Sequence, residues 1–423
     1  MILYAKGEKD IEISDGEITE ALITSLEKWG KTKNVLILPP DFTRFHSYAG
    51  RITEMLWNYL GDKIKDVLPA LGTHFEMTVP EIQTMFGKTP QSLFRVHKWK
   101  EDLTTLGIVP GDFVSEVSEG KVNYEWPAQV NKLLAEGGHD LILSIGQVVP
   151  HEVVGMANYN KNIFVGTGGR EGINKSHFLG AVYGMERMMG RANTPVRKVL
   201  NYASENFANH LPIIYVLTVM GKNENGKLVM RGLYIGDDYE TFKLAAALSL
   251  EVNFEMIDEP LNKVVCYLDP EEFKSTWLGN KSVYRTRMAI ADEGELIVLA
   301  PGLREFGEDK EIDRLIRKYG YQTTPEILKY VEENDELKNN LSAAAHLIHG
   351  SSENRFKITY CPGHITENEI RKANYNYTSL EEMLKKYDPR KLKDGKNIMA
   401  DGEEIFYISN PALGLWSYKG NFN

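Results

Sequence analysis

A glycine-rich segment of the sequence places three side chains with acid/base or ligating chemistry close together. His151, Lys161 and His177 lie within 27 residues, and glycines are interleaved among them. Imidazoles move protons or hold a metal near neutral pH, a lysine amine can form covalent bonds, and glycines let a ligand approach the backbone. Because the chain has only ten histidines among 423 residues, we interpret residues 146–177 as a cofactor-binding segment with acid/base groups beside it.

Three polar loops that follow predicted strands could share one rim, because ligands bind at the carboxyl ends of parallel strands. In the first loop, Asp41 and Arg44 could bind a ribose hydroxyl and a phosphate, or form a turn whose Asp caps backbone amides. In the second, His74 could face the same cleft or cap the helix that begins near Thr78. The third loop ends at His151.

Each of the other candidate residues can be interpreted in two ways. Gly168 and Gly169 could bind phosphate through backbone amides at the start of a helix, or form an ordinary strand-to-helix turn. His97 has no periodic pattern around it, which is more typical of a surface or core histidine than of a catalytic one. Arg285 and Arg287, on a predicted helix, suit a carboxylate ligand or a solvated face.

Composition and missing motifs exclude several classes of protein. The net charge of −10 argues against binding to nucleic acid or to an anionic membrane. Two distant cysteines fit a reducing compartment, and we find neither a membrane-spanning apolar run nor a signal peptide, so we expect a cytoplasmic protein. The chain has no P-loop, no GxGxxG in register and no GxSxG nucleophile elbow.

Short apolar runs alternate with amphipathic segments, which favours an α/β fold with largely parallel sheets. We predict strands at 35–40, 65–72, 140–149, 264–269, 295–302 and 357–363, with a hairpin over 211–236. We predict helices at 48–61, 78–87, 172–189, 238–252, 282–294 and 324–349. The length indicates two or three domains. We place a boundary near residue 258, which gives two α/β domains, 1–258 and 259–423.

Taken together, these motifs resemble those of the nickel-pincer-nucleotide lactate racemase family. Its members carry a DxTR loop, a GTH element, an isolated histidine and a GxxxPH segment that leads to a lysine and a further histidine. The corresponding residues here are DFTR at 41–44, GTH at 72–74, His97, GQVVPH at 146–151, Lys161 and His177. The family's intervals of ten residues from histidine to lysine and sixteen from lysine to histidine both recur in this chain.

The resemblance implies two α/β domains that enclose nickel and a pyridinium-3,5-bisthiocarboxylic acid mononucleotide, the nickel-pincer nucleotide, which other proteins would make. It implies that the nucleotide is held by Asp41, Thr43, Arg44, His74, Gly168 and Gly169. Lys161 would be the tether, His177 the nickel ligand, and His97 and His151 the proton-transfer groups, while Tyr284 and Arg285 would face the substrate.

The implied reaction inverts C2 of a 2-hydroxy acid by reversible hydride transfer, with one histidine on each side. The family usually has Ser-Gly-Gly-x before the lysine, whereas Ala157-Asn158-Tyr159-Asn160 stand here, which leaves open whether the cofactor is tethered. The hydrogen-bonding groups of residues 158–160, and Arg285 with Arg287 near the substrate, favour a sugar acid or other polar acid over lactate. The alternatives are a hydroxy-acid dehydrogenase or dehydratase and a non-catalytic nucleotide- or carboxylate-binding homologue.

Overall fold

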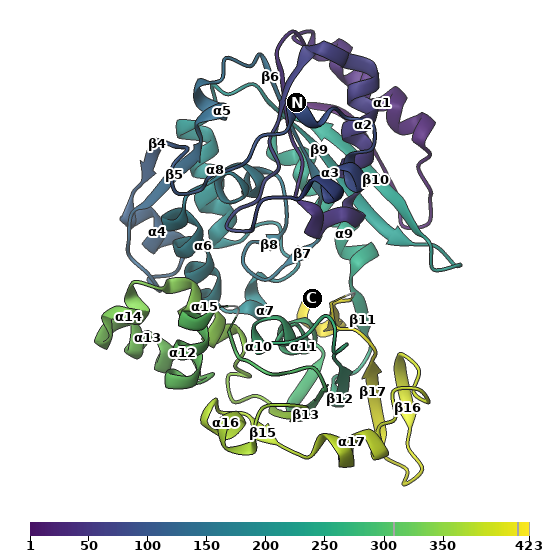
Figure 1. Ribbon diagram of the computed structural model, residues 1–423, viewed down its shortest axis with the longest axis vertical. Helices are drawn as coiled ribbons and strands as arrows, with labels where there is room; N and C mark the ends of the chain where they lie inside the picture. The colour runs from purple at the N-terminus through teal and green to yellow at the C-terminus, as the bar shows by residue number, and fades with distance from the viewer. Residues whose placement is uncertain (308, 413, 423) are drawn as a thin grey trace. The chain divides into compact units, whose positions relative to one another are not determined.

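Short apolar runs of the sequence form the centres of two separate sheets (Figure 1). The computed structural model describes residues 1–307, 309–412 and 414–422. Unit 1 consists of Met1–Leu179 and Arg187–Asn253, and unit 2 of Gly180–Glu186 and Phe254–Asn423. Both are mixed α/β structures, which confirms the predicted class.

The sheet of unit 1 is parallel over the part that faces the predicted loops. Its strands, in the order in which they lie side by side, are β1 (Ile2–Gly7), β10 (Leu228–Gly236), β9 (Ile213–Lys222), β6 (Leu141–Gln147), β2 (Val35–Leu38) and β3 (Ile64–Val67). The four strands from β9 to β3 run parallel, and β9, β10 and β1 pair antiparallel, so the predicted hairpin is confirmed. The carboxyl ends of β6, β2 and β3 therefore meet at one edge.

Helices cover both faces of this sheet. The helices of unit 1, and two that carry the chain across the segment 180–186, are α1 (Asp15–Trp29), α2 (Ala49–Leu60), α3 (Val79–Phe86), α4 (Gly111–Val117), α5 (Lys132–Glu136), α6 (Arg170–Tyr183), α7 (Met185–Met188), α8 (Pro195–Phe207) and α9 (Tyr239–Asn253). Apolar residues of α1 and α2, such as Ile18 and Leu56, share one core with Leu233 of β10. The α9 helix covers the other face, because its Leu248 lies against Gly232, whose neighbour Leu233 points the opposite way.

Smaller elements complete unit 1. They are the antiparallel pairs β4 (Leu103–Val109) with β5 (Trp126–Asn131) and β7 (Pro150–His151) with β8 (Gly155–Met156), the 3-10 turn Phe42–Ser47 and the π-turn Asn162–Gly166. The α3 helix begins as the sequence predicts. Thr78 is its N-cap, its hydroxyl accepts from the N–H of Glu81, and Pro80 lies in the first turn.

Unit 2 is built round a second parallel sheet. Its strands, in spatial order, are β15 (Asn376–Tyr377), β14 (Lys357–Pro362), β13 (Ile290–Ala300), β12 (Leu261–Tyr267), β17 (Glu404–Ile408) and β16 (Gly395–Ile398). Only β16 pairs antiparallel among the described residues of this sheet. Its other elements are α10 (Thr276–Gly279), α11 (Lys281–Thr286), α12 (Lys310–Tyr319), α13 (Thr324–Glu333), α14 (Asp335–Lys338), α15 (Leu341–His349), α16 (Glu367–Lys372), α17 (Leu380–Lys386), β11 (Glu255–Ile257) and β18 (Trp416–Tyr418).

Two helix predictions in unit 2 need correction. The helix predicted over 282–294 ends at Thr286, because Ile290 already begins β13, which pairs with strands on both sides. The helix predicted over 324–349 is three helices, broken at Asn334 and again before Asn340. Asparagine favours caps and turns over helix interiors, which accounts for both breaks.

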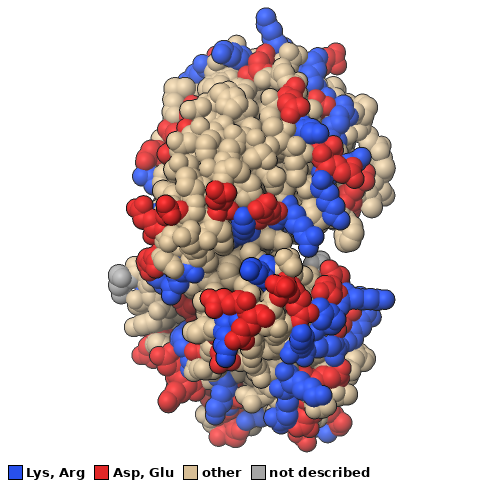
Figure 2. Space-filling view, turned by 90° about the vertical axis from the view of Figure 1, so that its left-hand side faces the viewer, with Lys and Arg blue, Asp and Glu red and all other residues tan. Residues whose placement is uncertain are grey.

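The surface charges are mixed in sign. Figure 2 shows Lys and Arg next to Asp and Glu over the face that it draws. One network joins Arg314 to Glu311 and Glu336, each at 2.8 Å. Exposed pairs of this kind contribute about 0–1 kcal/mol each, so the two apolar cores supply most of the stability. Among the described residues, no helix has both the length and the apolar character that a membrane crossing requires.

A glycine contact between α2 and α3 generates a prediction about stability. A Cβ on Gly50 would lie 2.0 Å from the carbonyl oxygen of Met85. Gly50→Ala should therefore lower the free energy of unfolding by about 1–3 kcal/mol, because the two helices must separate. Gly16, also the second residue of its helix, has open space round its Cβ position, with Ser14 Oγ at 3.9 Å as its nearest neighbour. Urea denaturation should show Gly16→Ala unchanged or slightly stabilised. Equal effects of the two substitutions would contradict the packing argument.

Candidate functional site

Two of the predicted loops meet directly at the carboxyl edge of unit 1. Asp41, just after β2, accepts a hydrogen bond from the N–H of Thr43 at 3.2 Å, and its Oδ2 lies 2.6 Å from Nδ1 of His74. Burial alone would raise the pKa of Asp41, but the hydrogen bonds from His74 and Thr43 outweigh it and lower the pKa. Asp41 is thus an ionised carboxylate that joins the two loops. Thr43 and Arg44 are exposed beside it.

Lys161 lies near the same loop, immediately before the π-turn Asn162–Gly166. Burial, and less strongly the positive charge of Arg44, lower the pKa of its amine to about 8, while Glu152 and Asp41 act in the opposite direction. About a tenth of such an amine is neutral at pH 7, against less than about a thousandth for an ordinary lysine. Lys161 is therefore a much better nucleophile than a solvated lysine.

His151 belongs to the same group of charges. Its Nδ1 accepts a hydrogen bond from the N–H of Val153 at 3.1 Å, which leaves Nε2 as the protonated nitrogen of the neutral ring. Burial lowers its pKa well below the ordinary value; Glu152 raises it, whereas Lys161 and neighbouring positive groups lower it. Arg44 is among those positive groups, so His151 lies near the loop of Arg44.

His177, on α6, is oriented by its own helix. Its Nδ1 donates to the carbonyl oxygen of Ile173 at 2.7 Å, so the lone pair of Nε2 points away from that bond. Burial lowers the pKa of the ring, and the charge of Lys161 lowers it too. A backbone acceptor at one nitrogen is the arrangement that fixes a histidine for metal binding through the other.

The donor set near His177 limits what kind of metal site is possible. Within the described ranges, no three His, Cys, Asp or Glu side chains are grouped so that they could hold a metal ion. A metal bound to Nε2 of His177 would take its other ligands from a bound organic group. One open imidazole beside an amine of low pKa fits a cofactor that brings its own metal donors.

His97 is held differently. It is 2% exposed, its Nε2 donates to the carbonyl oxygen of Gly168 at 3.0 Å, and its Nδ1 accepts from Nδ2 of Asn131 at 3.0 Å. Burial lowers its pKa, against the opposing effects of Gly168 and Asp102. The ring is neutral and both nitrogens are engaged inside unit 1, so neither is open to a ligand in this conformation.

Packing explains the two glycines that were predicted to bind phosphate. A Cβ on Gly168 would lie 1.8 Å from the carbonyl oxygen of Phe164, and one on Gly169 would lie 2.2 Å from Oε1 of Gln129. A side chain is therefore excluded at Gly168 by backbone without any ligand, whereas one at Gly169 would require the side chain of Gln129 to move. The space that each Cβ would need is already filled by the protein.

The predicted substrate residues lie in unit 2, on α11. Tyr284 is buried, and Arg285 is partly exposed with its Nε buried and without a hydrogen-bond partner among the described residues. Arg287, in contrast, is 2% exposed and donates to Oε1 of Glu186 at 2.7 Å and to the carbonyl oxygen of Ser351 at 3.1 Å. The interpretation of Arg287 as a carboxylate-binding residue is therefore wrong, and only Arg285 retains that capacity.

Residues 156–160, here called the lysine loop, have a special backbone. Asn158 and Tyr159 adopt positive φ angles of 66° and 58°. Asparagine enters this region readily, whereas a tyrosine there costs about 1–2 kcal/mol and needs support from its surroundings. The left-handed backbone occurs at the positions where the resembled family usually has glycines.

Arg197, on α8, provides much of that support. Its Nη2 donates to the carbonyl oxygens of Met156 at 2.7 Å and Asn158 at 3.2 Å, and its Nη1 donates to Asn158 at 3.2 Å and to Oδ1 of Asn160. The guanidinium is fully buried, and burial lowers its pKa to about 10, which still leaves it charged at neutral pH. One buried cation therefore ties together three residues of the lysine loop.

Aromatic rings enclose the same cation. Tyr159 packs on Phe242, with ring centroids 5.2 Å apart and planes at 19°, and on Tyr215 at 4.3 Å. The guanidinium of Arg197 lies 4.3 Å from the ring centre of Phe242. Cation–π contacts of a desolvated guanidinium contribute about 2 kcal/mol, which helps offset the burial of the charge.

These contacts correct one argument about the substrate. The side chain of Asn160 is directed to α8, where its Nδ2 donates to Oδ1 of Asn201 at 2.7 Å and to Oγ of Ser204 at 3.1 Å. Tyr159 is 6% exposed and Asn158 7% exposed. The contacts of residues 158–160 therefore hold the lysine loop inside unit 1. These side chains give no support to a preference for a sugar acid.

Sequence reasoning missed the supporting residues on α8. Arg197, Asn201 and Ser204 are spaced by four and three positions, so a helix places them on one face. Three polar residues at that spacing indicate that this face of the helix contacts polar groups. Their partners in the lysine loop, about forty residues earlier, cannot be read from spacing.

Residues 17–189 match the family described as the lactate racemase N-terminal domain. No curated protein matches the chain.

Two solved structures match nearly the whole chain. A crystal structure of a protein from Thermotoga maritima is 26% identical, with a TM-score of 0.79 over 98% of this chain and 100% of that one. The lactate racemase apoprotein from Thermoanaerobacterium thermosaccharolyticum is 17% identical, with a TM-score of 0.69 over 97% and 94%, and it shows that the fold is shared. Residues 17–189 thus match the lactate racemase N-terminal domain, and nearly the whole chain shares the fold of the two solved structures.

Proposed function

We propose that the protein is a nickel-pincer-nucleotide-dependent racemase or epimerase that inverts C2 of a 2-hydroxy acid. The main support is that Arg44, His151, Lys161 and His177 lie near one another: the charge of Arg44 lowers the pKa of His151 and Lys161, and the charge of Lys161 lowers the pKa of both histidines. The match of residues 17–189 to the lactate racemase N-terminal domain also supports an isomerase of this kind. We expect it to work in the cytoplasm, with its cofactor made by other proteins.

Different residues of the chain would bind different parts of such a cofactor. Arg44 and Thr43 would bind the nucleotide, on a loop that Asp41 and His74 fix in place. Lys161, with its lowered pKa, would form the covalent link, and Nε2 of His177 would ligate nickel. When bound, the group supplies a reversible hydride acceptor. Gly168 and Gly169 would lie beside it as parts of the packed turn.

Proton transfer falls to the histidines. To take the proton of the substrate hydroxyl at Nε2, the neutral ring of His151 would carry its own proton on Nδ1, which requires the bond from the N–H of Val153 to break. The imidazolium so formed would return a proton from Nε2. His97 keeps the role of the second group by resemblance, and its use requires the bond from Nε2 to Gly168 to break. On unit 2, Arg285 would bind the substrate carboxylate, together with Tyr284; lactate and a more polar 2-hydroxy acid share this group.

Activity and isotope retention test this function together. The holoenzyme, given a 2-hydroxy acid with deuterium at C2, should return the inverted acid with the deuterium retained, because a hydride that returns does not exchange with water. His151→Ala should slow inversion by about 10²–10⁴-fold. His210→Ala, at an exposed histidine of unit 1, should leave the rate unchanged. Chiral chromatography with mass spectrometry measures both quantities.

Three outcomes would contradict the proposal. Loss of deuterium to water would indicate proton abstraction from C2. Undiminished inversion in His151→Ala or in His97→Ala would remove the two-histidine assignment. Binding of 2-hydroxy acids without any turnover by the nickel-loaded protein would favour the non-catalytic homologue.

The contacts of Arg197 predict the titration of Lys161. In Arg197→Met the lysine loop loses its buried cation, so Lys161 loses a positive neighbour and gains solvent. Both changes raise the pKa of Lys161 from about 8 toward its ordinary value near 10.5. Competitive acetylation of the apoprotein at a series of pH values, read at Lys161 by peptide mass spectrometry, measures this shift.

A second buried arginine of unit 1 provides the control. Arg231 is 7% exposed and donates to the carbonyl oxygens of Ile11 at 2.8 Å and Lys222 at 2.9 Å, and it is not among the charges that act on Lys161. Arg231→Met should therefore leave the titration of Lys161 unchanged, and Arg197→Lys should retain part of the shift. The same titration in Arg197→Met and wild type would show that Arg197 does not position Lys161.

A further inference from the structure

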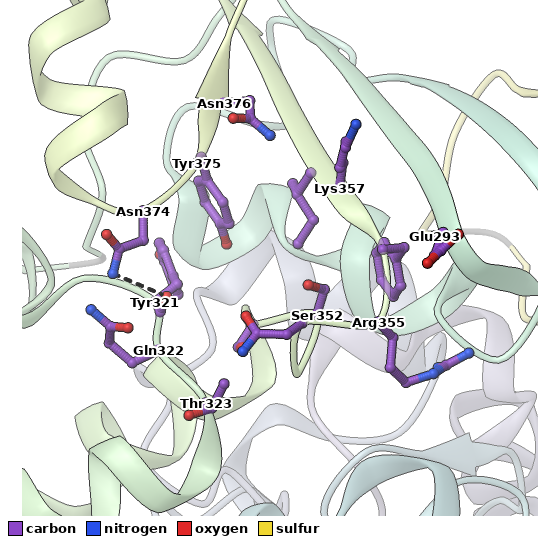
Figure 3. Close-up of a pocket in the computed structure, with 14 residues that line it drawn as sticks. Glu293, Tyr321, Gln322, Thr323, Ser352, Arg355, Lys357, Asn374, Tyr375 and Asn376 are labelled. Atoms are coloured by element: carbon purple, nitrogen blue, oxygen red, sulfur yellow. Dashed lines mark hydrogen bonds between the residues drawn. The ribbon is translucent and has the colours of Figure 1, made fainter.

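Unit 2 contains a cavity that none of the residues discussed above as ligand-binding lines. Its volume is 720 Å³, within the range of about 300–1,000 Å³ typical of small-molecule sites. Figure 3 shows the side chains that line it, among them Gln322, Ser352, Asn374 and Lys357. Gln322 lies between α12 and α13, Ser352 and Asn374 lie on the connections that precede β14 and β15, and Lys357 begins β14. Every lining residue belongs to unit 2.

The frame of the cavity is fixed by buried contacts. The hydroxyl of Tyr375 donates to the carbonyl oxygen of Gly350 at 2.8 Å, and the N–H of Tyr321 donates to Ala373 at 3.0 Å. Glu353 accepts from the N–H of Thr324 at 3.0 Å. A frame of this kind need not be ordered when a ligand binds, which lowers the cost of binding.

Left-handed residues gather at the same place. Positive φ angles occur at Glu293 (64°), Glu353 (53°), Asn354 (60°) and Asn374 (66°), which line the cavity or adjoin it. These are half of the eight non-glycine residues with positive φ among those described. Such conformations persist only where the surroundings impose them, and they are frequent at ligand sites.

Most of the polar side chains that line the cavity, in contrast, form no hydrogen bond or ion pair with other described residues of the protein. Within the described part of the chain, six of its polar side chains have no hydrogen-bond or ion-pair partner, namely Gln322, Thr323, Ser352, Asn354, Lys357 and Asn376. Arg355 also lines the cavity, but its guanidinium is occupied by Asp292 at 2.8 Å and Glu186 at 3.2 Å. Lys357 is therefore the one uncommitted cation among the described lining residues, and the exposed carboxylate of Glu293 balances it.

The chemistry of these groups selects a class of ligand. Primary amides and hydroxyls each donate and accept, as the neighbouring hydroxyls of a sugar do. A phosphate or polycarboxylate would call for several cations, and a metal ion for several carboxylates. We propose that this cavity binds a small neutral polyhydroxyl compound, a sugar or polyol, at a site distinct from the residues of the proposed racemase reaction.

Saturation-transfer NMR on the full-length apoprotein tests this site. The probes are D-glucose, D-ribose and myo-inositol at millimolar concentration, with D-gluconate as the anionic counterpart. At least one neutral probe should bind, and the double variant Gln322→Ala/Asn376→Ala should weaken it about tenfold, the effect of one to two hydrogen bonds. The matched control Gln91→Ala/Asn206→Ala replaces an exposed glutamine and asparagine of unit 1 and should bind as wild type does.

The outcomes separate this proposal from the proposed function. Lys161→Ala should retain sugar binding, because Lys161 is not part of the cavity. Failure of all neutral probes to bind would overturn the proposal, as would binding of D-gluconate alone. Unchanged binding in the cavity variant, with its fold verified by circular dichroism, would place the ligand elsewhere and also overturn it.

Discussion

The geometry of the site depends on one buried cation. Arg197 is enclosed by backbone carbonyls, an amide oxygen and aromatic faces, and these contacts hold the lysine loop in a left-handed conformation at Tyr159. Removing one partner from a buried charged contact typically costs about 3–5 kcal/mol, so the cation and the loop must be retained together. The loop leads directly into Lys161, whose pKa is lowered mainly by burial and in small part by the charge of Arg197.

The three candidate histidines differ in how many of their ring nitrogens are engaged in hydrogen bonds. His151 and His177 each have one nitrogen engaged by local backbone and the other left open, which suits proton transfer and metal binding respectively. His97 has both nitrogens engaged, although it matches the resembled family equally well. A residue of the expected type is therefore not always free to bind a ligand or transfer a proton. For His97, the loop of Gly168 would have to move so that its bond to Nε2 breaks.

Much of this could be predicted from the sequence, because local patterns encode it. Apolar runs located β2 and β6, the Thr78 cap located α3, and polar residues after strands located the joined loops of Asp41 and His74. What failed depends on distant partners. Periodicity cannot show that Asn160 bonds to Asn201, that Arg287 binds Glu186, or that Phe164 fills the space next to Gly168. Residues that resemble ligand-binding groups in sequence are, in these cases, committed to packing.

The most direct test of the account is the intact mass and nickel content of the protein after co-production with the cofactor-making proteins. The account predicts about one nickel per chain, as one open imidazole allows, and a mass increment that disappears in Lys161→Ala. Nickel without an increment would show a cofactor that is not joined to Lys161 and would contradict the tether. Protein with neither nickel nor an increment would contradict the nickel-pincer assignment as a whole.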